Sequence, residues 1–235
     1  HCSCFHYFPA CVNVFLPKEK SMESKVTCII PFYNEGHRLY SVLDEMVAVK
    51  NLAEIICVDD CSSEDRSAEI QKRYSGIKLI RLDKNLGKSG AVREGLKHTN
   101  GDFVLLFDAD LRNVKHEEIE QAINAVQKTD NIDMLILRRI NAPLIIKLDR
   151  GDILFTGERI LKKQNLETIL QGSVKGWQLE SAINMWMYKN KKQVYWFPYS
   201  GLNTHKPWKW GVINGLKHDI KTFSDMISAA GFINL

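Results

Sequence analysis

The sequence lacks a long hydrophobic run, and this absence sets the first limit on function. No segment approaches the roughly 20 consecutive apolar residues that a transmembrane helix needs, although 45% of the 235 residues are hydrophobic. The net charge is only +4 at pH 7, which is too small to argue for nucleic-acid binding. We therefore expect a globular protein without a nucleic-acid partner, and a content of 26% charged residues fits that class.

Two familiar nucleotide-binding motifs are also missing. Residues 87–89, Gly-Lys-Ser, look like the end of a P-loop, but the glycine that should open that motif is absent. No G-x-G-x-x-G follows the first predicted strand, so a dinucleotide-dependent oxidoreductase of the usual kind is excluded. The loop at residues 31–35 reads Pro-Phe-Tyr-Asn-Glu instead.

The cysteines form no recognisable disulfide or zinc pattern. Three of the six lie in the first 17 residues together with His1 and His6, but their spacing matches no usual zinc site. That segment also lacks the basic start and uninterrupted apolar run of a signal peptide. We predict that residues 1–21 are an extension, disordered or outside the fold, and that residues 22–235 form a single domain.

The remaining cysteines suggest a reducing environment. Cys28, Cys57 and Cys61 lie in or beside apolar strands, where unpaired thiols behave as small core residues. We therefore expect a cytoplasmic location, with a peripheral position at the inner face of a membrane left open.

What the sequence does contain is an alternation of short apolar runs and segments of helical period. The predicted strands cover residues 26–30, 54–58, 77–82, 103–107, 132–137 and 194–197. The predicted helices cover residues 39–49, a segment from about Asp65 with Ser62 or Ser63 as its cap, and residues 87–97, 117–127, 156–164 and 177–189. Alternating strands and helices indicate βαβ units, so the expected fold class is α/β with a mainly parallel sheet flanked by helices.

Polar clusters follow these strands at the point where each one ends. They lie at residues 31–35, 59–60, 85–89 and 108–110. Because βαβ connections are right-handed, the carboxyl ends of the strands gather at one edge of the sheet. Open α/β sheets place their ligands at that edge, and we expect one site there.

Asp108 and Asp110 are the most informative pair in these clusters. They follow the apolar run 103–107 and are separated by one small residue, Ala109. In an extended strand, side chains two residues apart point to the same face. Such a pair can hold a hard divalent cation that carries phosphate oxygens, although a solvated turn has the same short pattern.

Taken together, four motifs resemble the family 2 glycosyltransferases of GT-A fold, especially the polyprenyl-phosphate (dolichyl-phosphate) sugar transferases. In order along the chain they are Pro31–Glu35, Val58–Asp65, Asn85–Gly95 and Asp108–Leu111. The similarity is specific in residues 22–111, the nucleotide-sugar half of the predicted domain, and weaker in residues 112–235, the acceptor half. The resemblance implies transfer of a hexose from a UDP- or GDP-sugar with Mg²⁺ or Mn²⁺ as cofactor. The acceptor stays open between a polyprenyl phosphate, a glycan and a small molecule.

The resemblance also implies roles for individual residues. Asp110 would bind the metal directly and act in catalysis, and Asp108 would reach the ribose or the metal shell. Glu180 would deprotonate an acceptor hydroxyl, a step that an already ionised lipid phosphate would not need. The late His205 would complete the metal shell. The expected nucleotide-sugar contacts are Pro31, Tyr33, Glu35, Asp59, Asp60, Lys88, Asp108 and Arg159.

Structural explanations exist for the same side chains. Helix capping would account for Asp59 and Asp60, and surface charge would account for Lys88 and Glu180. Two other functions stay open: a non-catalytic nucleotide-sugar-binding module and a nucleotidyltransferase on a similar sheet. A non-catalytic module would have lost some of the carboxylates, but all of them are present. A nucleotidyltransferase would have a Gly-rich loop with arginine after the first strand, and the sequence has no such loop. The tryptophan-rich segment around residue 208 favours a lid or a contact with a membrane surface, and the oligomeric state is not predicted.

Overall fold

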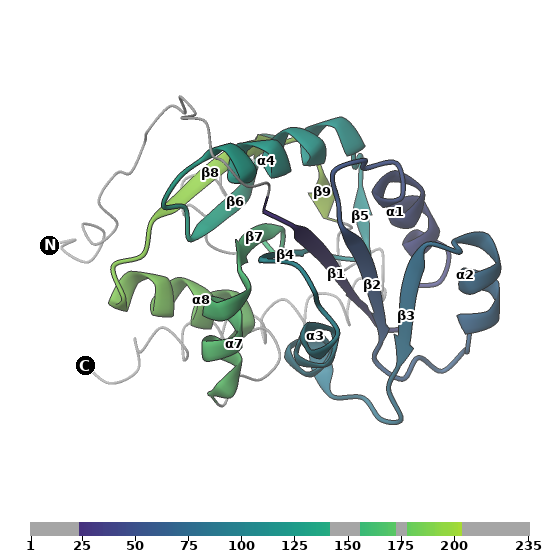
Figure 1. The fold of residues 1–235 in the computed structure, drawn as a ribbon. Helices are drawn as coiled ribbons and strands as arrows, with labels where there is room; N and C mark the ends of the chain where they lie inside the picture. Colours follow the sequence, from purple (N-terminus) through teal and green to yellow (C-terminus); the bar gives the residue numbers. More distant parts are fainter. Residues whose placement is uncertain (1–23, 142–155, 173–177, 204–235) are drawn as a thin grey trace, which may run out of the picture.

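The computed structural model describes residues 24–141, 156–172 and 178–203. Seven strands form one sheet in the order β3-β2-β1-β4-β7-β6-β8 (Figure 1). The strands are β1 (Val26–Phe32), β2 (Glu54–Asp59), β3 (Ile77–Arg81), β4 (Phe103–Leu106), β6 (Met134–Arg139), β7 (Arg159–Lys162) and β8 (Val194–Tyr199). Strands β5 (Leu111–Arg112) and β9 (Leu202–Asn203) form a small antiparallel pair of their own.

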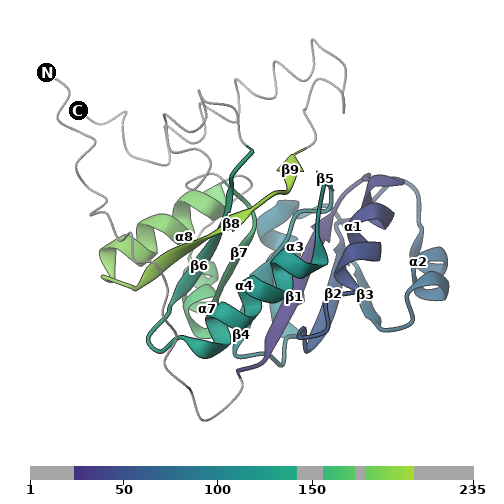
Figure 2. The same cartoon turned by 90° about the horizontal axis from the view of Figure 1, so that it is seen from above.

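Helices cover both faces of the large sheet. Helices α1 (Arg38–Met46), α2 (Ser67–Arg73) and α4 (His116–Lys128) contribute to the hydrophobic core on one face. Helices α3 (Gly87–Lys97), α7 (Lys163–Gln171) and α8 (Gln178–Lys189) contribute to the core on the other face. Seen from above, α4 lies over the middle of the sheet (Figure 2).

Strand β1 illustrates why these segments become strands. Cys28 and Ile30 point into the core shared with α1 and α4, whereas Ile29 points into the core shared with α3. All three side chains are fully buried. A strand covered on both faces reads as a continuous apolar run, and for that reason the apolar runs of the sequence locate β1, β2 and β4 well.

The sheet is mostly parallel, as predicted. Strands β1, β2, β3 and β4 pair in parallel, and β8 pairs in parallel with β6. Strand β7 is the exception, because it runs antiparallel to both β4 and β6. The predicted α/β class with a mainly parallel, helix-flanked sheet is confirmed. The predicted extension at residues 1–21 lies outside the described residues, and the division into two halves stays a prediction.

Two predictions about local structure are wrong. Residues 156–164 do not form a helix: Arg159–Lys162 form β7, and α7 begins at Lys163. Their charged residues suggest a surface helix, but pairing with β4 and β6 places this segment inside the sheet. Ser62 and Ser63 do not cap α2 either, because that helix begins at Ser67, whose N–H donates to Asp65 Oδ1 at 2.9 Å.

Two expected properties of the chain can be compared with the described part of it. Within those residues, no helix is long and apolar enough to cross a membrane. Cys28, Cys57 and Cys61 are unpaired, as predicted. Burial raises the pKa of the thiols of Cys28 and Cys57 well above the ordinary value.

Candidate active site

The strand ends predicted to gather at one edge do meet there. The N–H of Asp60 donates to Phe32 O at 2.9 Å, and the N–H of Phe107 donates to Ile29 O at 3.1 Å. Pro31 lies in β1 just past the end of its pairing with β4, which stops at Ile29. Backbone groups two residues apart on a strand face the same neighbour, so Pro31 faces the side on which β4 has ended and no ladder donor is lost.

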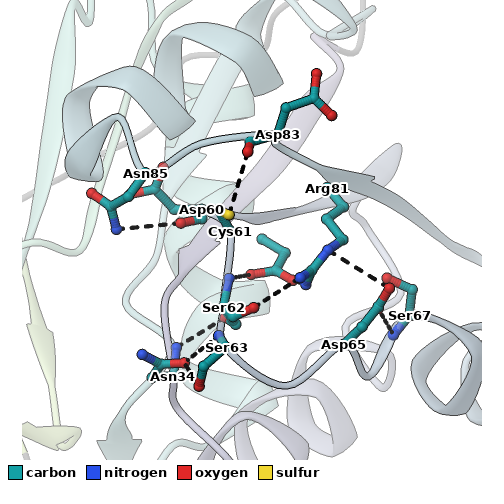
Figure 3. Close-up of polar contacts among 11 residues, drawn as sticks. Asn34, Asp60, Cys61, Ser62, Ser63, Asp65, Ser67, Arg81, Asp83 and Asn85 are labelled. Carbon is teal, nitrogen blue, oxygen red and sulfur yellow. Dashed lines mark hydrogen bonds and ion pairs between the residues drawn. The ribbon is translucent and has the colours of Figure 1, made fainter.

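The loop after β1 is fixed to the loop after β2 by Asn34. Asn34 has a positive φ of 56°, a conformation that asparagine tolerates better than most residues. Its N–H donates to Ser62 Oγ at 2.9 Å, and its Oδ1 accepts from Ser63 N–H at 2.8 Å (Figure 3). Beside it, Tyr33 is 47% exposed, and Glu35 accepts a hydrogen bond from Arg38 at 3.3 Å. The loop therefore presents an aromatic ring on a backbone held in place by neighbouring side chains.

Asp59 is buried and committed to the protein. Its Oδ1 accepts from Ser62 N–H at 2.8 Å, and its Oδ2 forms an ion pair with Arg81 at the end of β3. Arg81 also donates to Ser62 O at 2.8 Å and lies 3.6 Å from Asp65 (Figure 3). Asp59 thus orders the loop that follows β2.

Asp60 holds the start of α3. Its Oδ1 accepts from Leu86 N–H at 2.7 Å and its Oδ2 accepts from Gly87 N–H at 2.8 Å. Burial raises the pKa of the Asp60 carboxyl, and these two N–H donors oppose that increase. Helix capping, the structural explanation given for Asp60 in the sequence analysis, therefore applies, but the capped helix is α3 and not α2. Gly87 has a φ of +72°, which suits glycine at this turn.

Asp108 and Asp110 lie beyond β4, in the turn between β4 and β5. Both side chains are partly exposed. Because the backbone there is a turn and not an extended strand, the strand argument for a shared direction does not apply. Gly157 lies against the Asp108 carboxylate so closely that a Cβ on Gly157 would overlap it. This glycine of the segment before β7 is therefore part of the surroundings of Asp108.

Lys88 connects three elements at this point. From the first turn of α3, its Nζ lies 2.5 Å from Asp108 Oδ1 and 2.6 Å from Glu180 Oε1 on α8. Burial disfavours the charged form of Lys88, but the carboxylates of Asp108 and Glu180 outweigh it and raise the pKa of Lys88. The structure thus brings together three residues that the sequence places in one site.

A buried charged cluster lies beside this contact. Glu158 and Arg159 are both fully buried. Glu158 Oε2 accepts from Thr156 Oγ1 at 2.5 Å and lies 3.5 Å from Arg139 Nε. Arg159 donates to Asn184 Oδ1 at 3.0 Å and to the carbonyl of Thr156. Burial raises the pKa of Glu158, Arg139 opposes this, and the nearby charge of Asp108 adds to it.

Several buried polar atoms of this region have no hydrogen-bond partner among the described residues. They are Glu180 Oε2, Glu158 Oε1, Arg159 Nε and the hydroxyl of Tyr199. Burial lowers the pKa of Arg159, and the charges of Glu180, Glu158 and Asp108 oppose that decrease. Buried polar atoms are normally paired, so these four are exceptions in the described part of the structure.

A metal site here would rest on few protein ligands. Within the described residues, no group of three or more histidine, cysteine or acidic side chains is arranged to hold a metal. His205, the predicted third ligand, lies outside those residues. Mg²⁺ is commonly held by one or two carboxylates together with substrate phosphates, so the carboxylates of Asp108 and Asp110 fit a cation that arrives with a nucleoside diphosphate.

A family model decides the classification. The model of "Glycosyl transferase family 2" matches residues 27–182. The chain belongs to this family. The resemblance drawn from the four motifs is therefore confirmed.

Curated relatives and solved structures agree with family 2. A dolichyl-phosphate beta-glucosyltransferase of Trichomonas vaginalis is 35% identical over 129 residues, which cover 48% of this chain and 37% of that protein. An undecaprenyl-phosphate 4-deoxy-4-formamido-L-arabinose transferase of Edwardsiella ictaluri is 38% identical over 112 residues, 44% of this chain and 34% of the relative. The chain thus spans well under half the length of either relative.

The fold matches that of glucosyl-3-phosphoglycerate synthase from Mycobacterium tuberculosis, solved in complex with Mn²⁺, UDP and phosphoglyceric acid. The TM-score is 0.66 at 18% identity, and the match covers 88% of this chain and 79% of that one. At this identity the likeness supports the fold, and the predicted GT-A-type architecture is confirmed.

Some residues of the site were not found by sequence reasoning. Arg81, Arg139 and Tyr199 belong to none of the four motifs. Arg81 lies directly opposite Asp59 in the pairing of β2 with β3, so a basic residue at the end of the neighbouring strand was an available signal. Arg139 and Tyr199 come from the half in which the motifs are weak, and no sequence signal pointed to them.

Proposed function

We propose that this chain is the catalytic domain of a family 2 glycosyltransferase that transfers a hexose from a UDP- or GDP-sugar. The observation that carries the proposal is the contact of Lys88 with Asp108 and Glu180, at the sheet edge where the loops after β1, β2 and β4 meet α3. It puts a cation, two carboxylates and the beginning of a helix in one place. That combination suits a diphosphate and its counter-ion.

The donor would be held by residues of the motif half. In this proposal Asp108 and Asp110 hold Mg²⁺ or Mn²⁺, Tyr33 packs on the base, and Lys88 lies near the phosphates. A bound divalent cation would offset the negative charge that develops on the leaving nucleoside diphosphate. Asp59 and Asp60 stabilise the site indirectly: Asp59 orders the loop after β2 and Asp60 holds the start of α3.

The acceptor that we favour is a polyprenyl phosphate. The names of the two relatives reported above each contain a polyprenyl phosphate, dolichyl phosphate in one and undecaprenyl phosphate in the other. Such an acceptor would place the domain at a membrane surface, and the unpaired cysteines suit its cytoplasmic side. Glu180, with one carboxylate oxygen on Lys88, is the candidate base if the acceptor is instead a hydroxyl.

The test is a screen of UDP- and GDP-hexoses for binding and turnover with Mn²⁺, comparing the wild-type chain with Asp110→Asn. We expect one nucleotide sugar to be bound and hydrolysed or transferred, and Asp110→Asn to lower turnover by about 100-fold or more, because one electrostatic partner of the leaving group is lost. Asp130→Asn is the matched control, since Asp130 is an exposed carboxylate in the turn before β6.

Two results would contradict the proposal. A nucleotide affinity that is unchanged both by a chelator and by Asp110→Asn would favour a non-catalytic binding module. Turnover that joins a nucleoside triphosphate to a sugar phosphate would favour a nucleotidyltransferase.

A further inference from the structure

The position of Lys88, which supports the proposed function, also bears on how the site binds a metal. Its ammonium lies between two carboxylates from distant parts of the chain, 2.5 Å from Asp108 Oδ1 and 2.6 Å from Glu180 Oε1. Its side chain is 20% exposed, that of Asp108 is 19% exposed and that of Glu180 is 7% exposed. The three groups are thus largely withdrawn from water. Opposite charges interact more strongly in such a partly buried place than at the protein surface.

Two arginines lie near this contact, and their ion-pair and hydrogen-bond partners described above are other groups. Arg139 lies by Glu158 at 3.5 Å. The guanidinium of Arg159 donates to neutral groups, the side chain of Asn184 and the carbonyl of Thr156. Among the described residues, Lys88 forms ion pairs with both Asp108 and Glu180, and it offsets charge at the carboxylate proposed to hold the metal.

An ammonium at this point has a direct consequence for metal binding. A divalent cation approaching Asp108 would meet a positive charge already bound to one of its oxygens. The metal would have to displace the ammonium or bind beside it against Coulombic repulsion. A nucleoside diphosphate changes this balance, because its phosphates offer Lys88 a new anionic partner and bring their own ligands for the metal.

We propose that Lys88 is a positioning residue that acts as an internal counter-ion: it holds Asp108 and Glu180 together in the nucleotide-free enzyme and suppresses binding of a divalent cation until the diphosphate arrives. This inference rests on the proposed function. It assigns an order to the site, in which the metal binds well only together with the donor. It also gives Glu180 a role that does not depend on deprotonating the acceptor.

The test is a titration of the nucleotide-free chain with Mn²⁺, followed by electron paramagnetic resonance of the free ion. We expect Lys88→Met and the more conservative Lys88→Gln to bind Mn²⁺ about 10-fold or more tightly than wild type, because a nearby positive charge is removed. Lys97→Met is the matched control, because Lys97 lies at the other end of α3 with a side chain that is 62% exposed. Its Mn²⁺ affinity should equal that of wild type.

A second titration with the cognate UDP- or GDP-sugar separates the two proposals. Wild type should then bind Mn²⁺ tightly, and both Lys88 variants should bind the nucleotide sugar more weakly than wild type. If wild type binds Mn²⁺ with the donor but the folded Lys88 variants show unchanged or weaker affinity without it, the counter-ion role is wrong and the proposed function stands. If no UDP- or GDP-sugar promotes Mn²⁺ binding to wild type, both are wrong.

Discussion

At the scale of single residues, acidic side chains of this site do two different kinds of work. Asp59 and Asp60 use both carboxylate oxygens on protein partners, Asp59 on Ser62 and Arg81, and Asp60 on the backbone of Leu86 and Gly87. They fix the loops on which the donor would lie. Asp108 instead contacts the ammonium of a long, flexible side chain, Lys88, which an incoming phosphate can take over.

The first prediction at this scale concerns Gly157. A Cβ at this position would overlap the carboxylate of Asp108, and the backbone there needs no positive φ. Gly157→Ala should therefore displace Asp108 and lower sugar transfer by about 10- to 100-fold, while stability falls by about 1–3 kcal/mol through overpacking. Turnover with saturating donor and thermal unfolding measure the two effects separately.

A second glycine serves as the control for this change. A Cβ added at Gly76 would meet no atom within 4 Å, so Gly76→Ala should leave transfer unchanged. Equal activity of Gly157→Ala and Gly76→Ala would show that the close approach of Gly157 to Asp108 does not affect sugar transfer.

How far single residues can be predicted depends on the sequence distance of their partners. The gathering of residues 31–35, 59–60, 85–89 and 108–110 followed from the alternation of strands and helices and from the right-handed connections between them. The contact of Lys88 with Glu180 joins residues 92 positions apart, and no local pattern reports such a pair. The commitment of Asp60 to α3 was hidden for the same reason, because capping is expected next to a helix in sequence and here comes from the end of β2.

At the scale of elements, burial decides which strands a sequence can reveal. Strands β1, β2 and β4 are apolar on both faces and were located within a residue or two. Strand β7 was missed because it begins at Arg159 and ends at Lys162, which suggested a helix. Its charges are tolerated because Arg159 is hydrogen-bonded inside the fold, and pairing with β4 and β6 outweighs local preference. Strands β5 and β9 have two residues each and are defined only by their pairing.

The prediction at this scale concerns the junction of α1 with α4. His116 begins α4, and its N–H and ring Nδ1 lie 3.1 and 2.9 Å from Glu45 Oε2 near the end of α1. The hydrogen bond to Glu45 raises the pKa of His116. A raised folded-state pKa gives stability that is fully present below the unfolded pKa of about 6.5 and is lost as pH rises through the folded value.

The measurement is thermal unfolding of wild type and His116→Gln at about pH 5.5 and about pH 8.5, below and above the unfolded pKa of histidine. The Tm of wild type should exceed that of His116→Gln by a larger margin at the lower pH. His37→Gln, which removes an exposed histidine at the N-cap of α1, controls for loss of a histidine as such. A margin that is constant or grows with pH would rule out the Glu45 contact as its source.

At the scale of the whole molecule, the site joins the two halves of the predicted domain. Lys88 reaches from α3 to Glu180 on α8, and Arg93 on α3 donates to Leu170 O at the end of α7 at 3.0 Å. Helices α7 and α8 follow the motif half in sequence but pack in the same core as α3. Donor binding at α3, as proposed, would therefore be physically connected to the elements that would face the acceptor.

The last prediction concerns the class of acceptor. A polyprenyl phosphate is already ionised near neutral pH and needs no base, whereas a polyprenol hydroxyl must lose a proton during attack. We therefore expect transfer to a short-chain polyprenyl phosphate and none to the polyprenol of equal length, measured as radiolabelled sugar extracted into organic solvent. Glu180→Gln should weaken transfer without altering its pH profile between about pH 6 and 8, because its carboxylate would position Lys88 and not accept a proton. Transfer to a hydroxyl acceptor, with a pH profile that changes in Glu180→Gln, would instead make Glu180 the base and the acceptor a glycan or a small molecule.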